Sequence, residues 1–182
     1  MIDQLIQNNY LLIDDFIKPE RAAHLYAKFK DDAGRYPSDF IQDEQCPKSR
    51  AIYDRRDFLG LLVEKTPFMT ETLQEPMIPT YSYARIYANG EVLARHTDRP
   101  ACECSVTIHL GSDGTPWPIG FTKPSGEQVE IELKPGQGVI YLGCISEHWR
   151  EAFTGQHYGQ VFLHYVRLNE ENWDCYFDKK KK

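Results

Sequence analysis

The chain has 182 residues, the length of one ordinary domain, which is enough to bury a core without disulfide cross-links. Its 21 basic and 27 acidic residues give a formal net charge of −6, which argues against a general nucleic-acid binder, because such proteins carry a basic face. The five cysteines form no disulfide framework, no apolar run is long enough for a membrane span, and the N-terminus lacks a signal-peptide pattern, so we expect a cytoplasmic, intracellular chain without membrane partners.

The first part of the chain is expected to be mainly helical. Residues 8–16 predict a short apolar strand followed by a turn. Pro19 and the acidic residue after it mark the start of a helix that ends near Gly34. The apolar residues of this helix recur at steps of three and four and indicate one buried face, formed by Ala22, Leu25, Tyr26 and Phe29.

Residues 35–56 are polar and contain two prolines, so we expect a long loop of the kind that covers a site. Beyond this loop the pattern predicts a helix over residues 58–64, a break at Pro67 and another short helix over 67–74. The helical part of the chain is therefore expected to extend to about residue 79.

From residue 80 the apolar residues alternate with period two, which is typical of strands. The first strand presents Tyr81, Tyr83, Arg85 and Tyr87 on one face. Further strands are predicted at 104–110, 129–133, 138–142 and 160–167, with Pro/Gly turns between them. We therefore expect one α+β domain over 1–182, with a sandwich or barrel core over about 80–170 and a disordered lysine tail at 179–182.

The segment 87–98 carries the clearest chemistry. On an extended backbone residues two apart face the same way, so His96 and Asp98 present an imidazole and a carboxylate together. One further histidine would complete the two-histidine, one-carboxylate set that binds non-haem Fe(II) and leaves positions open. A His-x-Asp pair is common by chance, and the alternative is a polar pair in a turn. Cys102 and Cys104 offer a separate zinc candidate, with ordinary reduced thiols as the alternative.

The residues around this pair resemble the Y-x-x-G-x-x-[YL]-x-x-H-x-D signature of the prolyl 4-hydroxylase-like branch of the 2-oxoglutarate/Fe(II)-dependent dioxygenases. The positions that match in register are Tyr87, Gly90, Leu93, His96 and Asp98. The resemblance covers most of residues 8–168 and makes His148 the distal metal ligand, with His157 and His164 as the next candidates. It also implies a double-stranded β-helix, or jelly-roll, core with supporting N-terminal helices.

The chain departs from this family at one position. Family members carry an Arg or Lys nine or ten residues after the distal histidine, and this cation binds the far carboxylate of 2-oxoglutarate. Here those positions hold His157 and Tyr158. Arg85 is the first substitute, and the remaining candidates are His157, Arg150 and Arg167; a structural ion pair is the alternative for each. Tyr87 and His109 stand where the family places further partners of the same carboxylate.

The resemblance implies a non-haem Fe(II), 2-oxoglutarate-dependent oxygenase in which His96, Asp98 and His148 are the catalytic metal ligands. Its cofactors would be Fe(II), 2-oxoglutarate and O₂, with ascorbate as a possible stimulant, and its products would include succinate and CO₂. The expected substrate is a C–H group of a peptide or protein side chain, or of a free amino acid or other small metabolite. Two alternatives remain: a cupin-like Zn or Mn enzyme, and a catalytically silent jelly-roll binding protein.

Overall fold

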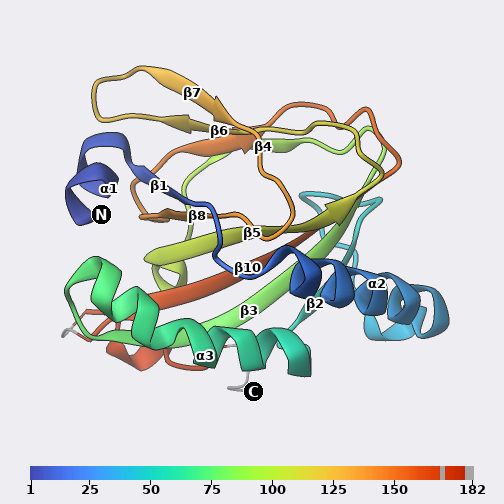
Figure 1. Ribbon diagram of the computed structural model, residues 1–182, viewed down its shortest axis with the longest axis horizontal. Coiled ribbons are helices and arrows are strands. Elements are labelled where there is room, and N and C mark those ends of the chain that lie inside the picture. The colour runs from blue at the N-terminus through green and yellow to red at the C-terminus, as the bar shows by residue number, and fades with distance from the viewer. Residues whose placement is uncertain (169–170, 179–182) are drawn as a thin grey trace.

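The computed structural model describes residues 1–168 and 171–178, and the lysine tail predicted at 179–182 lies outside them. Two antiparallel sheets face each other, and the two longer helices lie on one side of the larger sheet (Figure 1). The larger sheet has the strand order β1-β8-β5-β10-β3-β2, and the smaller sheet the order β4-β9-β6-β7. Apart from the hairpin β6–β7, consecutive strands from β3 to β10 fall in opposite sheets, which is the arrangement of a jelly roll.

The bounds of the larger sheet are β1 Tyr10–Ile13, β2 Arg50–Tyr53, β3 Met77–Ala88, β5 Cys104–Ser112, β8 Gly138–Tyr141 and β10 His157–Arg167. Those of the smaller sheet are β4 Leu93–His96, β6 Ile119–Thr122, β7 Gln128–Ile131 and β9 His148–Arg150. The helices are α1 Ile2–Asn8, α2 Pro19–Arg35 and α3 Arg56–Leu73, with short 3-10 turns at Pro37–Asp39, Pro100–Cys102 and Trp173–Cys175. None of the helices in the described residues is long and apolar enough to cross a membrane.

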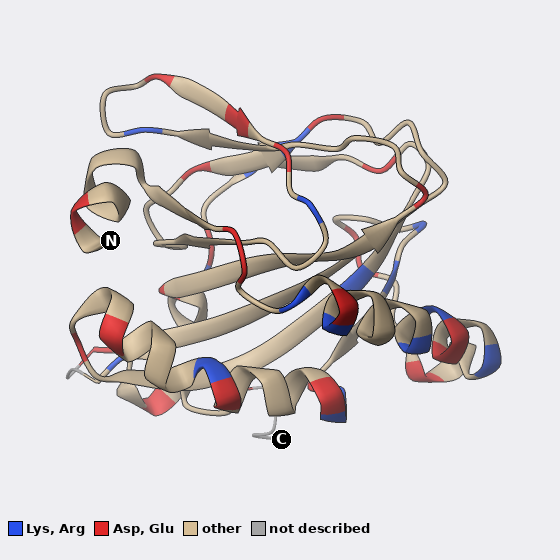
Figure 2. Cartoon of the chain, in the orientation of Figure 1, with Lys and Arg blue, Asp and Glu red and all other residues tan. Residues whose placement is uncertain are grey.

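Helices α2 and α3 cover the outer face of the larger sheet. The predicted apolar stripe of α2 is buried there, with α2 packed on β5 and α3 packed on β3 and β10. In Figure 2 the charged residues lie chiefly on these helices and on loops, whereas the strands of the larger sheet are mostly uncharged. The main hydrophobic core therefore lies between the helices and the sheet, which leaves the inner face of the sheet available for polar side chains.

The helix break predicted at Pro67 is wrong, because α3 runs without interruption from Arg56 to Leu73. Proline removes one main-chain hydrogen bond, but apolar side chains are buried on both sides of it, among them Leu62 and Met69. The carbonyl of Leu62 also accepts bonds from the hydroxyls of Thr66 and Tyr165. Tertiary packing thus outweighs the local preference of proline.

Residues 35–56 are also more ordered than the predicted loop, because they contain the strand β2 at the edge of the larger sheet. Its residue Ala51 pairs with Arg85 of β3 and is fully buried. A strand of four residues with one buried side chain leaves no periodic pattern in the sequence, which is why it was missed. Pairing of β2 with β3 holds the preceding segment, residues 40–49, over the inner face of β3.

Candidate active site

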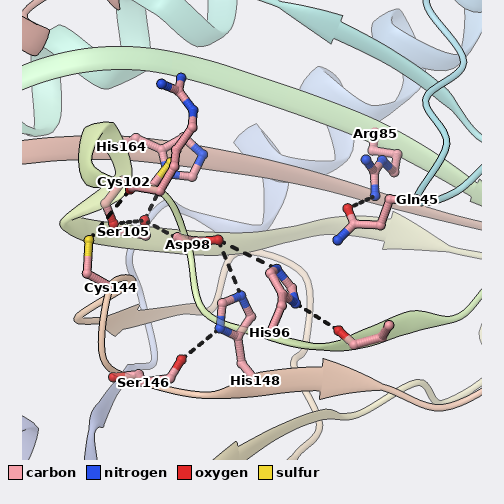
Figure 3. A network of polar contacts seen from close by, with 12 residues as sticks. Gln45, Arg85, His96, Asp98, Cys102, Ser105, Cys144, Ser146, His148 and His164 are labelled. Atoms are coloured by element: carbon pink, nitrogen blue, oxygen red, sulfur yellow. Dashed lines mark hydrogen bonds and ion pairs between the residues drawn. The ribbon is translucent and has the colours of Figure 1, made fainter.

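The structure brings three of the predicted residues together at the edge of the smaller sheet. His96 ends β4 and His148 begins β9, and the two lie opposite each other in the antiparallel pair. Asp98 follows two residues after His96, and its main-chain N–H donates to the carbonyl of Gly143 at 2.8 Å. Strand pairing and this one bond therefore position all three side chains, which point toward one another in Figure 3.

The donor atoms of these three side chains are arranged to hold a metal ion. Oδ1 of Asp98 lies 3.5 Å from Nε2 of His96 and 3.8 Å from Nε2 of His148. Nδ1 of His96 lies 2.8 Å from the carbonyl of Ala94, and Nδ1 of His148 lies 2.9 Å from that of Ser146. A carbonyl only accepts, so each Nδ1 carries the proton and each Nε2 keeps a free lone pair, as a metal ligand requires.

The electrostatics of the three groups suit a cation. Burial lowers the pKa of His148, which is 3% exposed, so this imidazole is neutral. Burial alone would raise the pKa of Asp98, but contacts with His96 and His148 outweigh it and lower that pKa. Burial likewise opposes charge on His96, but the contact with Asp98 raises its pKa. The set offers one carboxylate and two imidazoles within 4.8 Å of one another, which fits a non-haem Fe(II) site.

A second group of possible ligands adjoins the first among the described residues. It consists of Asp98, Cys102 and His164, again with ligand atoms within 4.8 Å. Burial raises the pKa of the Cys102 thiol to about 12, so it is protonated and a poor ligand. Cys104, the other cysteine of the predicted zinc candidate, is fully buried in β5 and belongs to neither group.

A cavity of about 170 Å³ opens beside the three residues. The tyrosine and phenylalanine side chains of its wall all come from the larger sheet, and the predicted shared face of β3 is among them. The smaller sheet contributes Leu93, His96 and His148. The lining residues are Asp43, Gln45, Tyr53, Tyr81, Tyr83, Arg85, Tyr87, Leu93, His96, Asp98, Cys102, Tyr141, His148, Phe162 and His164. A candidate metal centre and a candidate anion-binding arginine therefore share one cavity.

Arg85 lies in this cavity and is only 3% exposed. Its Nη2 donates to the carboxylate of Asp43 and, at 2.9 Å, to the hydroxyl of Tyr83. Its Nη1 lies 3.3 Å from the amide oxygen of Gln45 and 3.4 Å from the hydroxyl of Tyr87, whereas its buried Nε has no partner. Burial opposes the charge, but the surrounding tyrosines and Asp43 raise the pKa of Arg85, so the guanidinium stays protonated.

Two histidines named from the sequence lie elsewhere. His157 is not among the lining residues of the cavity; its ring contacts α2 instead, with Nδ1 2.7 Å from the hydroxyl of Tyr26 and Nε2 2.9 Å from Nζ of Lys30. His109 stacks on Tyr158 at 4.1 Å between ring centres, also outside the lining. Burial and the nearby Arg150 lower the pKa of His109 to about 4, so it is neutral.

The other two arginines named from the sequence also lie outside the cavity lining. Arg150 is 2% exposed and donates to the carbonyl of Trp117 and, at 2.9 Å, to the amide oxygen of Gln160. Arg167 forms ion pairs with Glu75 and Glu103. Of the four substitutes for the missing cation, the structure places only Arg85 in the cavity with His96, Asp98 and His148.

Sequence reasoning missed Asp43 and Gln45, which reach the cavity from the segment before β2. Nothing in the local pattern marks them, since their position depends on the pairing of β2 with β3. His164 was named only as an alternative metal ligand; its Nδ1 lies 2.8 Å from the hydroxyl of Ser105. The alternation of residues along 160–167 was the one available signal for its inward position.

No protein-family model matches the chain, and no curated protein does. Among solved structures, a prolyl-4-hydroxylase from Pseudomonas putida superposes with a TM-score of 0.75 at 13% identity, over 92% of this chain and 97% of that one. The non-heme alpha ketoglutarate dependent epimerase SnoN from nogalamycin biosynthesis gives 0.77 at 11% identity, over 91% and 80%. An oxidoreductase of the 2OG-Fe(II) oxygenase family from Burkholderia pseudomallei gives 0.68 at 17%, over 94% and 92%.

These superpositions confirm the predicted α+β class with a jelly-roll core and N-terminal helices. They also confirm that the chain is a structural match to the 2-oxoglutarate/Fe(II) oxygenases. At these identities the match concerns the fold, and the neighbours named above include both a hydroxylase and an epimerase. The reaction must therefore be argued from the cavity itself.

Proposed function

We propose that this chain is an Fe(II)- and 2-oxoglutarate-dependent oxygenase. One observation carries the proposal: a two-histidine, one-carboxylate set and a buried, charged arginine line the same small cavity. A 2-oxo dicarboxylic acid needs both, because one end of it chelates a metal and its far carboxylate needs a positive partner inside the protein. The fold shared with 2-oxoglutarate/Fe(II) oxygenases supports the same function.

His96, Asp98 and His148 would hold the metal through Nε2, a carboxylate oxygen and Nε2. Fe(II) bound there would supply oxygen activation coupled to the oxidative decarboxylation of 2-oxoglutarate to succinate and CO₂. The protein's own part is to keep both imidazoles in the tautomer that binds metal, through the carbonyls of Ala94 and Ser146. Three protein ligands leave three positions for the cosubstrate and O₂.

Arg85 would bind the far carboxylate of 2-oxoglutarate. Its unpartnered Nε and its weakly bonded Nη1 offer donors, and the hydroxyl of Tyr87 lies beside them. A charged hydrogen bond of this kind is worth about 1.5–3 kcal/mol. His157 and His109, the other cosubstrate-binding residues named from the sequence, have no part in this proposal because they do not line the cavity.

The reaction we propose is hydroxylation of a C–H group in a peptide or protein side chain, or in a free amino acid or other small metabolite. Gln45 and Tyr53 line the cavity and are exposed, so a substrate could enter between the segment 40–49 and β2. Ascorbate as a stimulant belongs to the same proposal. One observation favours a silent binding protein instead: the carboxylate of Asp43 already occupies Arg85.

The test is anaerobic reconstitution with Fe(II), followed by addition of 2-oxoglutarate and then O₂. We expect a visible charge-transfer absorption when the 2-oxo acid chelates the metal, and succinate that requires both Fe(II) and 2-oxoglutarate. N-oxalylglycine, which resembles 2-oxoglutarate but resists decarboxylation, should suppress succinate formation. Fe(II) binding without any 2-oxoglutarate binding at millimolar concentration would contradict the proposal and favour the cupin-like or silent alternatives.

A further inference from the structure

Asp43 places a fixed carboxylate at the outer end of the cavity. Its Oδ2 accepts bonds from the hydroxyl of Tyr83 at 2.5 Å and from Arg85, and its Oδ1 accepts the main-chain N–H of Cys46 at 2.9 Å. The side chain is 30% exposed, so a molecule from solvent can reach it. The carboxylate is therefore both held in place by the protein and open to a ligand.

The charges around the cavity do not balance once the metal and cosubstrate proposed above are bound. Fe(II) would be offset by Asp98 together with the near carboxylate of 2-oxoglutarate, and Arg85 by the far carboxylate. The carboxylate of Asp43 would then remain as an uncompensated negative charge. This holds whether Asp43 stays on Arg85 or moves away, because one guanidinium carries one positive charge.

The tyrosine and cysteine side chains of the lining do not supply the missing charge, and His164 lies at the metal end, with its ligand atom within 4.8 Å of those of Asp98 and Cys102. Burial raises the pKa values of Tyr81 and Tyr83, so their hydroxyls are neutral, and it raises that of the Cys102 thiol to about 12. A partly desolvated carboxylate without a partner costs free energy, so a cationic group at this end would be favoured.

The walls beside Asp43 also suit a cation. The ring of Tyr53 lies 4.6 Å from that of Tyr83 and 5.5 Å from that of Tyr81, and Tyr53 is 39% exposed. Aromatic faces beside a carboxylate attract ammonium and guanidinium groups through their quadrupoles.

The charged residues outside the cavity do not remove the preference of this end of the cavity for a cation. Asp39 and Glu44 are exposed and lie close to Asp43 in the sequence, so they add negative charge to this part of the chain. Lys48 is exposed on the same segment and lies outside the cavity lining. Arg99 stacks on Tyr81 at 4.8 Å, and its charge is met by Asp178 at 2.6 Å.

We propose that the primary substrate presents a positively charged group, an alkylammonium or a guanidinium, to the carboxylate of Asp43 and the tyrosine wall beside it. This inference rests on the proposed function, because the uncompensated charge arises from bound metal and 2-oxoglutarate. It narrows the substrate to a cationic amino acid, a basic peptide side chain or a small amine, and it gives Asp43 the role of a specificity-determining residue.

The experiment uses the full chain loaded with Mn(II) and N-oxalylglycine, whose binding is measured first by calorimetry. The probes are the N-acetyl amides of lysine and arginine, each paired with a neutral analogue of similar shape, norleucine and citrulline. We expect at least one cationic probe to bind roughly tenfold or more tightly than its neutral analogue, and to stimulate 2-oxoglutarate decarboxylation by the Fe(II) protein.

Two variants test whether the tighter binding of cationic probes depends on Asp43. Asp43→Asn should remove the preference for the cationic probe while binding N-oxalylglycine at least as tightly as the wild type. Glu44→Gln, which removes an equal charge from the neighbouring residue outside the cavity, should keep the preference.

The outcomes separate this inference from the proposed function. If the metal-loaded chain does not bind N-oxalylglycine or 2-oxoglutarate, the proposed function fails, and the inference fails with it. If the chain binds them but binds cationic and neutral probes equally, or binds neither at millimolar concentration, the inference alone is wrong. A cationic preference that survives in Asp43→Asn also overturns it.

Discussion

The two ends of the cavity are built differently. At the metal end, His96 and His148 lie opposite each other on paired strands, and their positions depend on main-chain bonds to neighbouring residues. At the other end, Arg85 projects from the larger sheet and meets Asp43, which comes from the segment before the edge strand β2. The metal end is thus preformed and open to a cation, whereas the arginine end is occupied by a carboxylate of the chain itself.

A comparison of Arg85 with Arg150, the other buried arginine named from the sequence, shows what distinguishes a candidate anion-binding arginine from a structural one. Arg85 and Arg150 are 3% and 2% exposed, and each guanidinium lies over two aromatic rings. Among the described residues, however, no carboxylate lies within ion-pair distance of Arg150, whose acceptors are a carbonyl and an amide. Of these two arginines, only Arg85 combines the cavity beside the three metal-site residues, a free donor and an anionic neighbour, so burial alone does not identify an anion site.

The largest effect is expected at the metal end. Asp98→Ala or His148→Ala removes a ligand atom, so Fe(II) affinity should fall by roughly 100-fold or more, since even outer hydrogen-bond partners are worth 10–100-fold. Bound iron per chain after equilibrium dialysis measures this. His24→Ala, on the exposed side of α2, serves as the control and should bind Fe(II) normally. Unchanged iron content in His148→Ala would show that the distal ligand is misassigned, and His164 would be tested next.

A second experiment compares the two buried arginines directly. Arg85→Gln should raise the 2-oxoglutarate dissociation constant by roughly 30-fold, which corresponds to about 2 kcal/mol for a charged hydrogen bond, and should leave metal affinity unchanged. Arg150→Gln should lower thermal stability, because Gln160 and the Trp117 carbonyl lose their donor, but should alter the dissociation constant less than threefold. The reverse pattern, with Arg150→Gln weakening 2-oxoglutarate binding more than Arg85→Gln, would exchange their roles.

Substitution of Gly143 tests whether close main-chain packing fixes the position of Asp98 at the metal end. A Cβ at Gly143 would lie 2.1 Å from the carbonyl of Cys102 and 2.7 Å from Oδ2 of Asp98. Gly143→Ala should therefore displace Asp98, destabilise the fold by about 1–3 kcal/mol and weaken Fe(II) binding about five- to tenfold. Gly60→Ala in α3, where a Cβ meets nothing within 4 Å, is the matched control. Wild-type metal affinity in Gly143→Ala would mean that Asp98 adjusts freely.

The smallest expected effect is that of pH on 2-oxoglutarate binding, because the charges at the arginine end do not change near neutral pH. The pKa of Arg85 is raised. Burial opposes ionisation of Asp43, but the bonds from Tyr83 and Arg85 outweigh it and lower the pKa of this carboxyl group. Both groups therefore keep their charges from pH 7 to 8.5. The 2-oxoglutarate dissociation constant should then change less than twofold over this range in calorimetric titrations. If an imidazole were the anchor, it would lose its proton as the pH rises, and binding would weaken.

The sequence predicts that His96 and Asp98 lie side by side because their geometry is local. Their spacing on an extended chain places both side chains on one side, whereas His148 is distant in sequence and is assigned by the resemblance to the oxygenase family. That Arg85 shares a face with Tyr83 and Tyr87 also follows from the period-two pattern of its strand. What could not be predicted depends on contacts distant in sequence: Asp43 is placed by an edge strand without a periodic pattern, and α3 continues through Pro67 because of packing on the sheet.

The proposed function requires that one 2-oxoglutarate molecule spans the cavity, with its 2-oxo acid end at the metal and its far carboxylate on Arg85. The most direct test titrates the anaerobic Fe(II) protein with 2-oxoglutarate and with pyruvate, which keeps the 2-oxo acid but lacks the far carboxylate. We expect the wild type to prefer 2-oxoglutarate by roughly 30-fold or more. We expect Arg85→Gln to lose this preference and to keep the pyruvate affinity of the wild type. An equal preference in both proteins would contradict the claim.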